Sequence, residues 1–224
     1  MRSILKIILG IFLTIQVYFF VQVVWYMEFN PKETAFMLAE KNRLSTLTPP
    51  RGITQQWVPY EKISLSIKRA VIASEDANFT FHDGVDWNAL EKAAKENAIQ
   101  GKIKRGGSTI TMQLSKNLFL SAEQSYIRKA QEIIITGMLE IVLSKKRILE
   151  IYLNAAEWGV GIFGIEAAAR HYFGISAAQL SPQQAAWLAA ILPAPRKFDQ
   201  LRNSTIATQK ANIIFYRMRM VNVP

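Results

Sequence analysis

The residues best suited to move a proton lie between positions 75 and 84. Glu75 and Asp76 end a stretch with helical spacing of apolar residues, and Phe79, Phe81 and His82 follow them. Burial against aromatic rings disfavours the charged form of a carboxyl group, which makes it a better general base. An acidic helix end more often carries solvated charge, and a single histidine is more often a structural hydrogen-bonding partner. The segment alone therefore does not identify a site.

A second polar segment could bind an anion. Gly106 and Gly107 precede Ser108 and Thr109, which predicts a helix that starts at a serine cap with free backbone N–H groups. The run from Gly101 nearly matches a nucleotide-binding P-loop, but Gly107 stands where that motif requires lysine. An ordinary capped helix after a basic turn explains the same residues. The spacing i, i+3, i+4 places three polar side chains on one face of that helix: Gln113, Lys116 and Asn117.

Two further segments are most simply explained as surface helices. Arg128 and Glu132 stand at i and i+4, which suits an ion pair on a helix surface, and Lys129 follows Arg128. The run that starts at Lys145 predicts an amphipathic helix, in which Glu150 and Asn154 lie one turn apart. Each segment admits a structural explanation, so a function must be argued from their combination.

The composition excludes several chemistries. The 224 residues contain no cysteine, which excludes disulfides, thiol nucleophiles and cysteine-ligated metal centres. With 27 basic and 17 acidic side chains, the chain has a net charge of +10. The first 26 residues hold two basic side chains, Arg2 and Lys6, and no acid, so the remainder carries a net charge of +8. This charge favours an anionic partner.

An apolar stretch at the N-terminus predicts a membrane anchor. Residues 7–24 are almost wholly apolar and nearly long enough to cross a hydrocarbon core of about 30 Å, with Trp25 and Tyr26 at the interface. A cleaved signal peptide is the alternative, but no small-residue cleavage site follows. Arg2 and Lys6 precede the span, so the positive-inside rule predicts a cytoplasmic N-terminus and an exported body. Export excludes nucleic acid and nucleotide cofactors as partners.

Helices dominate the exported body, so we predict a mainly α fold. Helical spacing predicts helices over 63–74, 86–100, 108–118 and 126–154, the last of them broken near Ser144. Ser181, Pro182 and Gln184 form a further helix start. Gly159, Gly161 and Gly164 predict a loop, and strand signals are weak throughout. We expect three parts: a cytoplasmic N-terminus and anchor at 1–27, a linker with an extended approach at 28–62, and a folded domain at 63–224.

The order and spacing of these segments resemble the motifs of the peptidoglycan glycosyltransferase family. The first family motif, Glu-Asp-x-x-Phe-x-x-His-x-Gly, matches the run from Glu75. Gly-Gly-Ser-Thr-x-x-x-Gln-x-x-Lys-Asn matches the run from Gly106, and Arg-Lys-x-x-Glu matches the run from Arg128. Lys-x-x-Ile-Leu-Glu-x-Tyr-Leu-Asn matches the run from Lys145, and a fifth block starts at Gly159. Five motifs in the family's order make chance similarity negligible.

The resemblance implies a fold and a reaction. The fold is lysozyme-like and helical, with a small membrane-associated lobe that we expect around residues 86–125. The reaction is polymerisation of lipid II, a disaccharide-pentapeptide on undecaprenyl diphosphate, into β-1,4-linked glycan with inversion at the donor sugar. Glu75 resembles the general base, and Glu132 resembles the family's second important glutamate in the catalytic site. The pairing of Glu132 with Arg128 suggests that it orients the phosphate-binding cations. The other motif positions imply substrate contacts: Asp76, Phe79, His82, Gly107, Ser108, Thr109, Gln113, Lys116, Asn117, Arg128, Lys129, Lys145, Glu150, Tyr152 and Asn154.

The resemblance also implies partners and a location. The partners are lipid II, the growing glycan strand and the bilayer of a bacterial inner membrane, with the catalytic domain in the periplasm. Proteins of cell-wall synthesis or division are further partners that the family admits. Relatives are often helped by Mg²⁺ or Mn²⁺, but no ligand cluster for a metal is evident in the sequence.

Two positions depart from the family pattern. Gln124 stands where many relatives carry an arginine that contacts phosphate, and Gln184 replaces a frequent glutamate at a helix start. No Ser-x-x-Lys follows the anchor, so we expect no transpeptidase activity.

Two other classes of protein remain open as alternatives to a glycosyltransferase. One is a lysozyme-like lytic enzyme, which needs no diphosphate site, and the other is a non-enzymatic module that binds anionic lipid or polymer.

Overall fold

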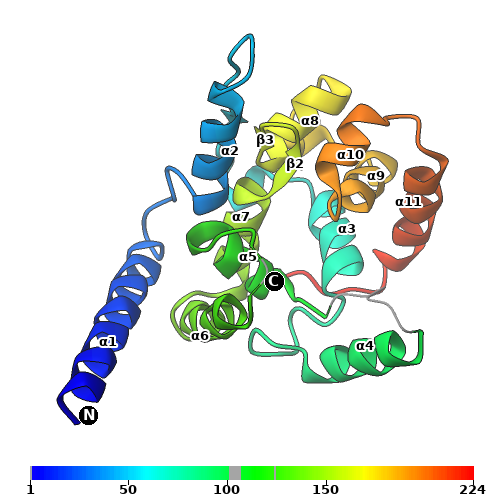
Figure 1. Ribbon diagram of the computed structural model, residues 1–224. Helices are drawn as coiled ribbons and strands as arrows, with labels where there is room; N and C mark the ends of the chain where they lie inside the picture. Colours follow the sequence, from blue (N-terminus) through cyan, green and yellow to red (C-terminus); the bar gives the residue numbers. More distant parts are fainter. Residues whose placement is uncertain (1, 101–106, 124) are drawn as a thin grey trace.

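One apolar helix extends from a helical body in the computed structural model of the protein (Figure 1). The structure describes residues 2–100, 107–123 and 125–224. Helices dominate these residues, so the predicted mainly α fold is confirmed. The basic turn predicted between Gly101 and Gly107 and the departure at Gln124 lie outside the described residues.

Helix α1 (Arg2–Trp25) has the length and composition of a membrane span. Its residues Ser3–Trp25 form the one helix in the described part of the chain that is long and apolar enough to cross a bilayer. The side chains of Ile4, Leu5 and Ile7 are all more than half exposed. A water-soluble domain would bury most of such a helix. The predicted anchor therefore corresponds to a single helix that is suited to a lipid environment.

The other end of α1 is docked on the body. The side-chain amides of Gln16 on α1 and Gln131 on α6 (Tyr126–Val142) exchange two hydrogen bonds, of 3.0 and 2.9 Å. Nearer the end of α1, the ring of Phe19 packs edge-on against the ring of Phe119, with centroids 5.4 Å apart. The anchor is thus part of the packed structure rather than a free tether.

Two groups of helices build the body. In the first group, α3 (Leu65–Glu75) and α11 (Thr205–Arg217) pack against α9 (Pro182–Ile191). In the second, α5 (Ile110–Phe119) is surrounded by α2 (Ala35–Ser45), α6 and α7 (Lys145–Ala155). The remaining helices are α4 (Trp87–Gln100), α8 (Ile165–Phe173) and α10 (Pro195–Gln200), and two short 3₁₀ helices are η1 (Tyr60–Lys62) and η2 (Ala177–Gln179).

Helix α5 belongs to the core of the body rather than to a separate lobe. We expected residues 86–125 to form the small lobe, but Ile110 and Leu114 of α5 are fully buried. Their apolar surface is stabilised by contact with the three helices around them. Of the expected lobe, α4 is the helix that lies outside this core. Figure 1 shows α4 at the lower right, and α6 at the lower left.

Large apolar side chains are exposed on and beside these two helices. Trp87 begins α4 and is 64% exposed, and Phe81 precedes it at 71%. Tyr126 and Ile127 begin α6 and are 97% and 85% exposed. Exposed aromatic and aliphatic side chains of this size suit contact with lipid, and α6 also packs against α1, the candidate membrane span.

A small sheet closes the body where we predicted only a loop. Its strand order is β1 (Thr54–Gln55), β3 (Ile162–Phe163) and β2 (Glu157–Gly159), with β1 parallel and β2 antiparallel to β3. Gly161 turns the chain between β2 and β3 at a φ of +72°, and a Cβ there would lie 2.8 Å from the Leu44 side chain. Strands of two or three residues carry too little alternation to be recognised in a sequence.

The segment predicted as an extended approach, 28–62, contains helix α2. Thr34 caps this helix by accepting a hydrogen bond from a backbone N–H group in its first turn. Glu40 of α2 is buried and forms ion pairs with Arg43 and with Arg196 of α10. The prolines that suggested an extended chain lie after α2, and residues 46–59 are indeed free of helix.

Most helix boundaries follow the capping residues of the sequence. The predicted break near Ser144 is present, because α6 ends at Val142 and a new helix, α7, begins at Lys145. Ser144 caps α7 by accepting a hydrogen bond from the backbone N–H three residues later. Ser181 starts α9 in a reciprocal capping box, as predicted. Thr109 rather than Ser108 caps α5, so that boundary was predicted one residue too early. Either hydroxyl suits the sequence pattern of a cap, and tertiary contacts decide between them.

Replacing Gln131 with leucine should loosen the contact between α1 and α6. The change leaves the Gln16 amide without its partner, and hydrogen bonds between membrane helices contribute about 0.6 kcal/mol. Backbone amides of α6 near position 131 should then exchange hydrogen about threefold faster in lipid nanodiscs. Thr14→Val is the control, because the Thr14 hydroxyl bonds to the Gly10 carbonyl of its own helix. Unchanged exchange in Gln131→Leu contradicts the docking.

Candidate active site

A cavity of about 640 Å³ lies between the two helical groups. The end of α3 and the segment after it form one wall, and α4 and the start of α5 form another. Helix α11 closes the remaining side. The polar side chains that line the cavity are Ser74, Glu75, Asp76, Asn78, Asp86, Lys92, Ser108, Thr109, Gln113, Lys210 and Arg217.

Glu75 is the last residue of α3 and lies in this cavity. Its Oε2 atom accepts a hydrogen bond of 3.0 Å from Nε2 of Gln113, one turn into α5. Its Oε1 atom accepts a hydrogen bond of 3.0 Å from Oγ of Ser74. The carboxyl group is therefore oriented from two helices and faces the cavity, which is the geometry that a general base requires.

Asp76 joins the two helices that meet at the cavity. It is 7% exposed, and its Oδ2 accepts the backbone N–H of Ile110, the first residue of α5, at 3.0 Å. Its Oδ1 lies 2.8 Å from Nε2 of His82, whose Nδ1 accepts the N–H of Gly84 at 3.2 Å. His82 therefore donates from Nε2 and accepts at Nδ1, so it orients the loop rather than moving a proton.

This arrangement changes the expected role of the start of α5. The sequence suggested an open helix start whose N–H groups bind an anion. In the structure, the Asp76 carboxylate occupies the Ile110 N–H, and the Thr109 hydroxyl occupies the N–H of Met112 at 3.1 Å. The helix end already has an anionic partner from the protein itself. Two of the N–H groups at this helix start, those of Ile110 and Met112, are therefore already engaged by the protein's own side chains.

A cation cluster lies next to Ser108, outside the cavity lining. It consists of Lys116 on α5 and of Arg128 and Lys129 on α6, with Glu132 among them. Glu132 is 2% exposed, and its two oxygens pair with Arg128 at 2.5 Å and with Lys129. Nζ of Lys129 also lies 3.2 Å from Oγ of Ser108, which lines the cavity. The cluster of three cations and one acid keeps positive charge next to the cavity.

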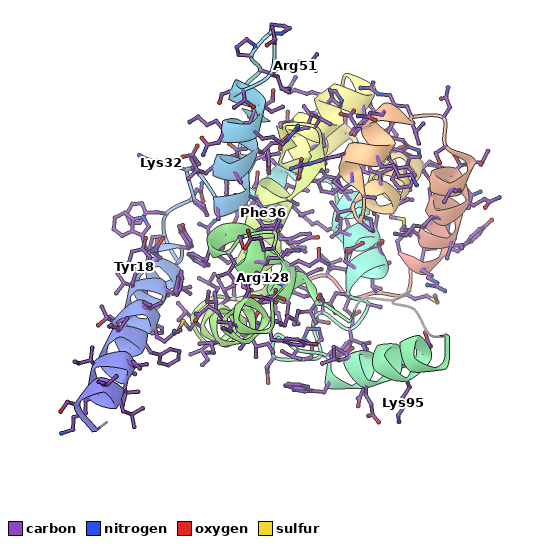
Figure 2. The ribbon with its side chains drawn as sticks, in the orientation of Figure 1. Tyr18, Lys32, Phe36, Arg51, Lys95 and Arg128 are labelled. Carbon is purple, nitrogen blue, oxygen red and sulfur yellow. The ribbon has the colours of Figure 1, made fainter. Side chains whose placement is uncertain are left out.

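Lys116 is the cation of this cluster that has no carboxylate partner within ion-pair distance among the residues that the structure describes. Burial lowers the pKa of its ammonium group from 10.5, and Arg128 and Lys129 lower it further, against the opposing effect of Glu132. Its Nζ lies 5.5 Å from the ring centre of Phe36 on α2. Figure 2 shows Phe36 and Arg128 near the centre of the molecule, on the two helices that flank α5. A desolvated ammonium group of this kind favours a multivalent anion as a ligand.

Other predicted site residues lie outside the cavity. Phe79 is fully buried in the core. Lys145 donates a hydrogen bond of 2.6 Å to the carbonyl oxygen of His82 and pairs with Glu140 at 2.9 Å. These contacts close the loop after α3 against α7. Asn117 lies half-buried next to Lys116 on α5.

Three further predicted site residues lie on α7: Glu150, Tyr152 and Asn154. The Asn154 side chain is fully buried and bonds both to the N–H and to the carbonyl oxygen of Val58. Glu150 pairs with Arg147 at 2.9 Å, and Arg147 in turn donates to backbone carbonyls in the segment after α1. Tyr152 is 1% exposed and donates to Oε1 of Gln113 at 2.9 Å. The structure does not bring these three side chains to the cavity.

Gly107 is required for a close approach of the two cavity walls. It lines the cavity where the segment before α5 passes α4. A Cβ atom at this position would lie 2.9 Å from the Cα of Leu90 on α4, which is closer than side-chain carbons approach a backbone. The glycine of the motif therefore has a steric role here.

Two cavity residues on α11 were missed by the sequence analysis. Lys210 and Arg217 line the cavity from the side opposite to the cation cluster. Burial lowers the pKa of the Lys210 ammonium group from 10.5, against the opposing effect of the nearby Glu75 carboxylate. Their spacing of seven residues places both side chains on one helix face, which is the signal that could have identified them.

The acids of the cavity do not form a metal site. Among the residues that the structure describes, no three His, Asp or Glu side chains lie close enough to share a metal ion. Asp86 accepts hydrogen bonds from the Ala89 N–H and the Asn78 amide, which hold the pKa of Asp86 below its ordinary value. We therefore assign no step of the reaction to a divalent cation.

The fold and the site together combine a candidate membrane-spanning helix with a cavity that contains carboxylates and cations. Glu75 shares its cavity with Lys210 and Arg217 of α11 and with Ser108, which is bonded to Lys129 of the cation cluster. Residues 40–219 match the family model described as transglycosylase.

Several proteins named biosynthetic peptidoglycan transglycosylase are similar to the chain over nearly its whole length, and three of them show the extent of the similarity. The one from Herminiimonas arsenicoxydans is 52% identical over 212 residues, which cover 95% of this chain and 92% of that protein. The one from Bordetella avium (strain 197N) is 53% identical over 226 residues, with 99% and 94% covered. For Methylobacillus flagellatus the identity is 50% over 209 residues, with 93% and 91% covered.

The chain therefore belongs to the transglycosylase family and is a glycosyltransferase. This confirms the resemblance found in the sequence.

Replacing Asp76 with asparagine should destabilise the protein. Asparagine offers one acceptor oxygen where the carboxylate uses two, so either His82 or the Ile110 N–H would face an NH₂ group. A buried donor without a partner costs about 2 kcal/mol, which corresponds to a melting temperature lower by roughly 4–8 °C. Asp83→Asn is the control, because Asp83 lies exposed in the same loop. Thermal unfolding in detergent measures both variants, and equal melting temperatures contradict the role of Asp76.

Proposed function

We propose that this chain polymerises lipid II into the β-1,4-linked glycan strands of peptidoglycan and releases undecaprenyl diphosphate. The observation that carries the proposal is the cavity that contains both Glu75 and Ser108. Ser108 is bonded to Lys129 of the cation cluster, so one cavity borders a candidate base and candidate diphosphate ligands. The names of the relatives, which are biosynthetic peptidoglycan transglycosylases, support this reaction.

Glu75 is the proposed general base. It takes the proton of the 4-hydroxyl of the acceptor's N-acetylglucosamine, and that oxygen attacks C1 of the donor's N-acetylmuramic acid. The bond from C1 to the diphosphate oxygen breaks, and its electron pair leaves with the diphosphate. Attack from the opposite face inverts C1 and produces the β-1,4 linkage. Each proton and electron pair is thereby assigned without a further reactant.

The cation cluster is the proposed site of the leaving diphosphate. A diphosphate leaves readily once its growing charge is countered, and Lys116, Arg128 and Lys129 supply positive charge for this. Glu132 has both oxygens engaged by Arg128 and Lys129, so it lacks a free oxygen to act as a base. Its role is to hold these two cations in place. This agrees with the orienting role that the spacing of Arg128 and Glu132 suggested in the sequence.

The membrane anchor fits a substrate that stays in the bilayer. Positive charge at Arg2 and Lys6 favours an N-terminus in the cytoplasm and a periplasmic catalytic domain in a bacterial inner membrane. The exposed apolar side chains on and beside α4 and α6 are the proposed membrane-associated lobe. A lipid-linked substrate then reaches the cavity while its polyprenyl chain remains in the bilayer.

Replacing Glu75 with glutamine should abolish polymerisation. Glutamine keeps the size and one hydrogen-bonding oxygen, but it cannot take the acceptor's proton, so the rate should fall at least about 100-fold. Binding of the donor should largely survive, because the cation cluster is unchanged. The measurement is conversion of lipid II to longer glycan in detergent or nanodiscs, together with binding of labelled lipid II. Near-normal turnover would remove Glu75 from the mechanism, and shorter glycan from cell-wall material would indicate a lytic enzyme.

Lipid II binding should weaken at high pH because of Lys116. Its pKa is lowered by burial, so it loses its charge at a lower pH than an exposed lysine does, and diphosphate binding is lost as the pH rises. Lys116→Arg should keep its charge and extend binding to higher pH. Dissociation constants between pH 7 and 10 test this, with the exposed Lys62→Arg as control. The same pH dependence for Lys116→Arg and wild type would contradict the role of Lys116.

A further inference from the structure

The two oxygens of Glu75 receive different hydrogen bonds, and one of these bonds leads into the protein core. Oε2 accepts from Nε2 of Gln113 at 3.0 Å, and Oε1 of Gln113 accepts from the Tyr152 hydroxyl at 2.9 Å. Oε1 of Glu75 instead accepts from Oγ of Ser74 at 3.0 Å. Tyr152 is 1% exposed, so the path from Oε2 ends at a side chain that substrate does not reach.

Tyr152 keeps its proton throughout the pH range in which an enzyme works. Burial, reinforced by the negative charges of Glu75 and Asp76, raises the pKa of the Tyr152 hydroxyl well above its ordinary value of 10.0. The hydroxyl is therefore a neutral and constant donor. It donates to the side-chain oxygen of Gln113.

The donor at Tyr152 determines which way the Gln113 amide faces. A side-chain amide carries an acceptor oxygen on one side and an NH₂ donor on the other. With its oxygen towards Tyr152, Gln113 points its NH₂ group at the Glu75 carboxylate. The reversed amide would place two acceptor oxygens against each other and lose the bond to Glu75. The tyrosine and the carboxylate together therefore select one orientation.

We propose that Tyr152 is a positioning residue that acts through Gln113 on Glu75; this inference rests on the role proposed above for Glu75. The Gln113 NH₂ group donates a hydrogen bond to Oε2 of Glu75 and keeps its proton, so Oε2 is not available to take a proton from the substrate. Oε1 is then the atom that takes the proton of the acceptor's hydroxyl. This role replaces the substrate contact that the sequence suggested for Tyr152.

Ser74 is placed to adapt when Oε1 becomes protonated. Its Oγ lies 3.0 Å from Oε1 of Glu75 and 3.3 Å from the carbonyl oxygen of Ala189 on α9. Before the transfer, the Ser74 hydrogen points to Oε1. After the transfer, it turns to the Ala189 carbonyl, and Oγ accepts the hydrogen that Oε1 has gained. The proton thus moves from the acceptor's hydroxyl to Oε1 without leaving a buried donor unpaired.

Tyr152→Phe in the full chain tests this inference, because phenylalanine fills the same space without the hydroxyl. We expect kcat for lipid II polymerisation to fall about 10-fold, while KM changes less than about twofold. Without a fixed NH₂ donor, the ionised form of Glu75 is less favoured. The acidic limb of the kcat profile should therefore move to higher pH by about one pH unit.

Tyr172→Phe is the matched control. Its hydroxyl donates to the carbonyl oxygen of Trp158 at 2.8 Å, so the change also removes one tyrosine hydrogen bond, but it lies outside the cavity. Gln113→Met provides the second test, because it removes the amide that connects Tyr152 with Glu75. The double variant Tyr152→Phe/Gln113→Met should be no slower than Gln113→Met alone.

Three outcomes would overturn the inference: an unchanged pH profile in Tyr152→Phe, an equal loss of kcat in Tyr172→Phe, or fully additive losses in the double variant. The Glu75→Gln variant separates this inference from the proposed function. An active Glu75→Gln enzyme removes the proposed base itself. An inactive Glu75→Gln with a fully active Tyr152→Phe leaves the proposed base in place and overturns the role of Tyr152 alone.

Discussion

The buried carboxylate of Asp76 is the interaction on which the rest of the site depends. It joins the end of α3 to the first N–H of α5, and these helices belong to different groups of the body. Glu75 directly precedes Asp76, and Gln113 lies three residues after Ile110, so this one junction sets the separation of the base and its hydrogen-bond donor. A buried charge is tolerated only when its oxygens are bonded. The loop at His82 must therefore close before the cavity has its shape.

The motif residues divide into those at the cavity and those that hold the cavity in place. Ser108 and Gln113 face the reacting region, whereas Lys145 and Asn154 bond to backbone groups of other segments. Both kinds of residue must be present for the chemistry. Replacing Lys145, for example, acts on the loop carbonyl of His82 rather than on substrate. A match to a family motif therefore marks the scaffold of a site as much as its contacts.

Local features of the fold were predictable from the sequence, and features that depend on distant contacts were not. The cap at Ser144 and the ion pair of Arg128 and Glu132 each involve residues within one helical turn, so their spacing alone predicts them. The bond from Asp76 to the start of α5 joins residues 34 positions apart, and no local pattern encodes it. The burial of α5 and the position of Lys210 opposite Glu75 likewise follow from how α5 and α11 pack. The sequence thus predicted the class of fold, whereas the hydrogen-bond partners of His82 and Tyr152 required the structure.

The docking of α1 also has a consequence for how the enzyme meets its substrate. The Gln16–Gln131 pair lies partway along α1, and Arg147 holds the segment that follows this helix, so anchor and body share one orientation. The mouth of the cavity then has a constant height and direction relative to the bilayer plane. The lipid-linked sugar that we propose as substrate is confined to that plane and would approach along two dimensions instead of three. Encounter then depends on lateral diffusion in the membrane, and its frequency follows the surface density of the substrate rather than its bulk concentration.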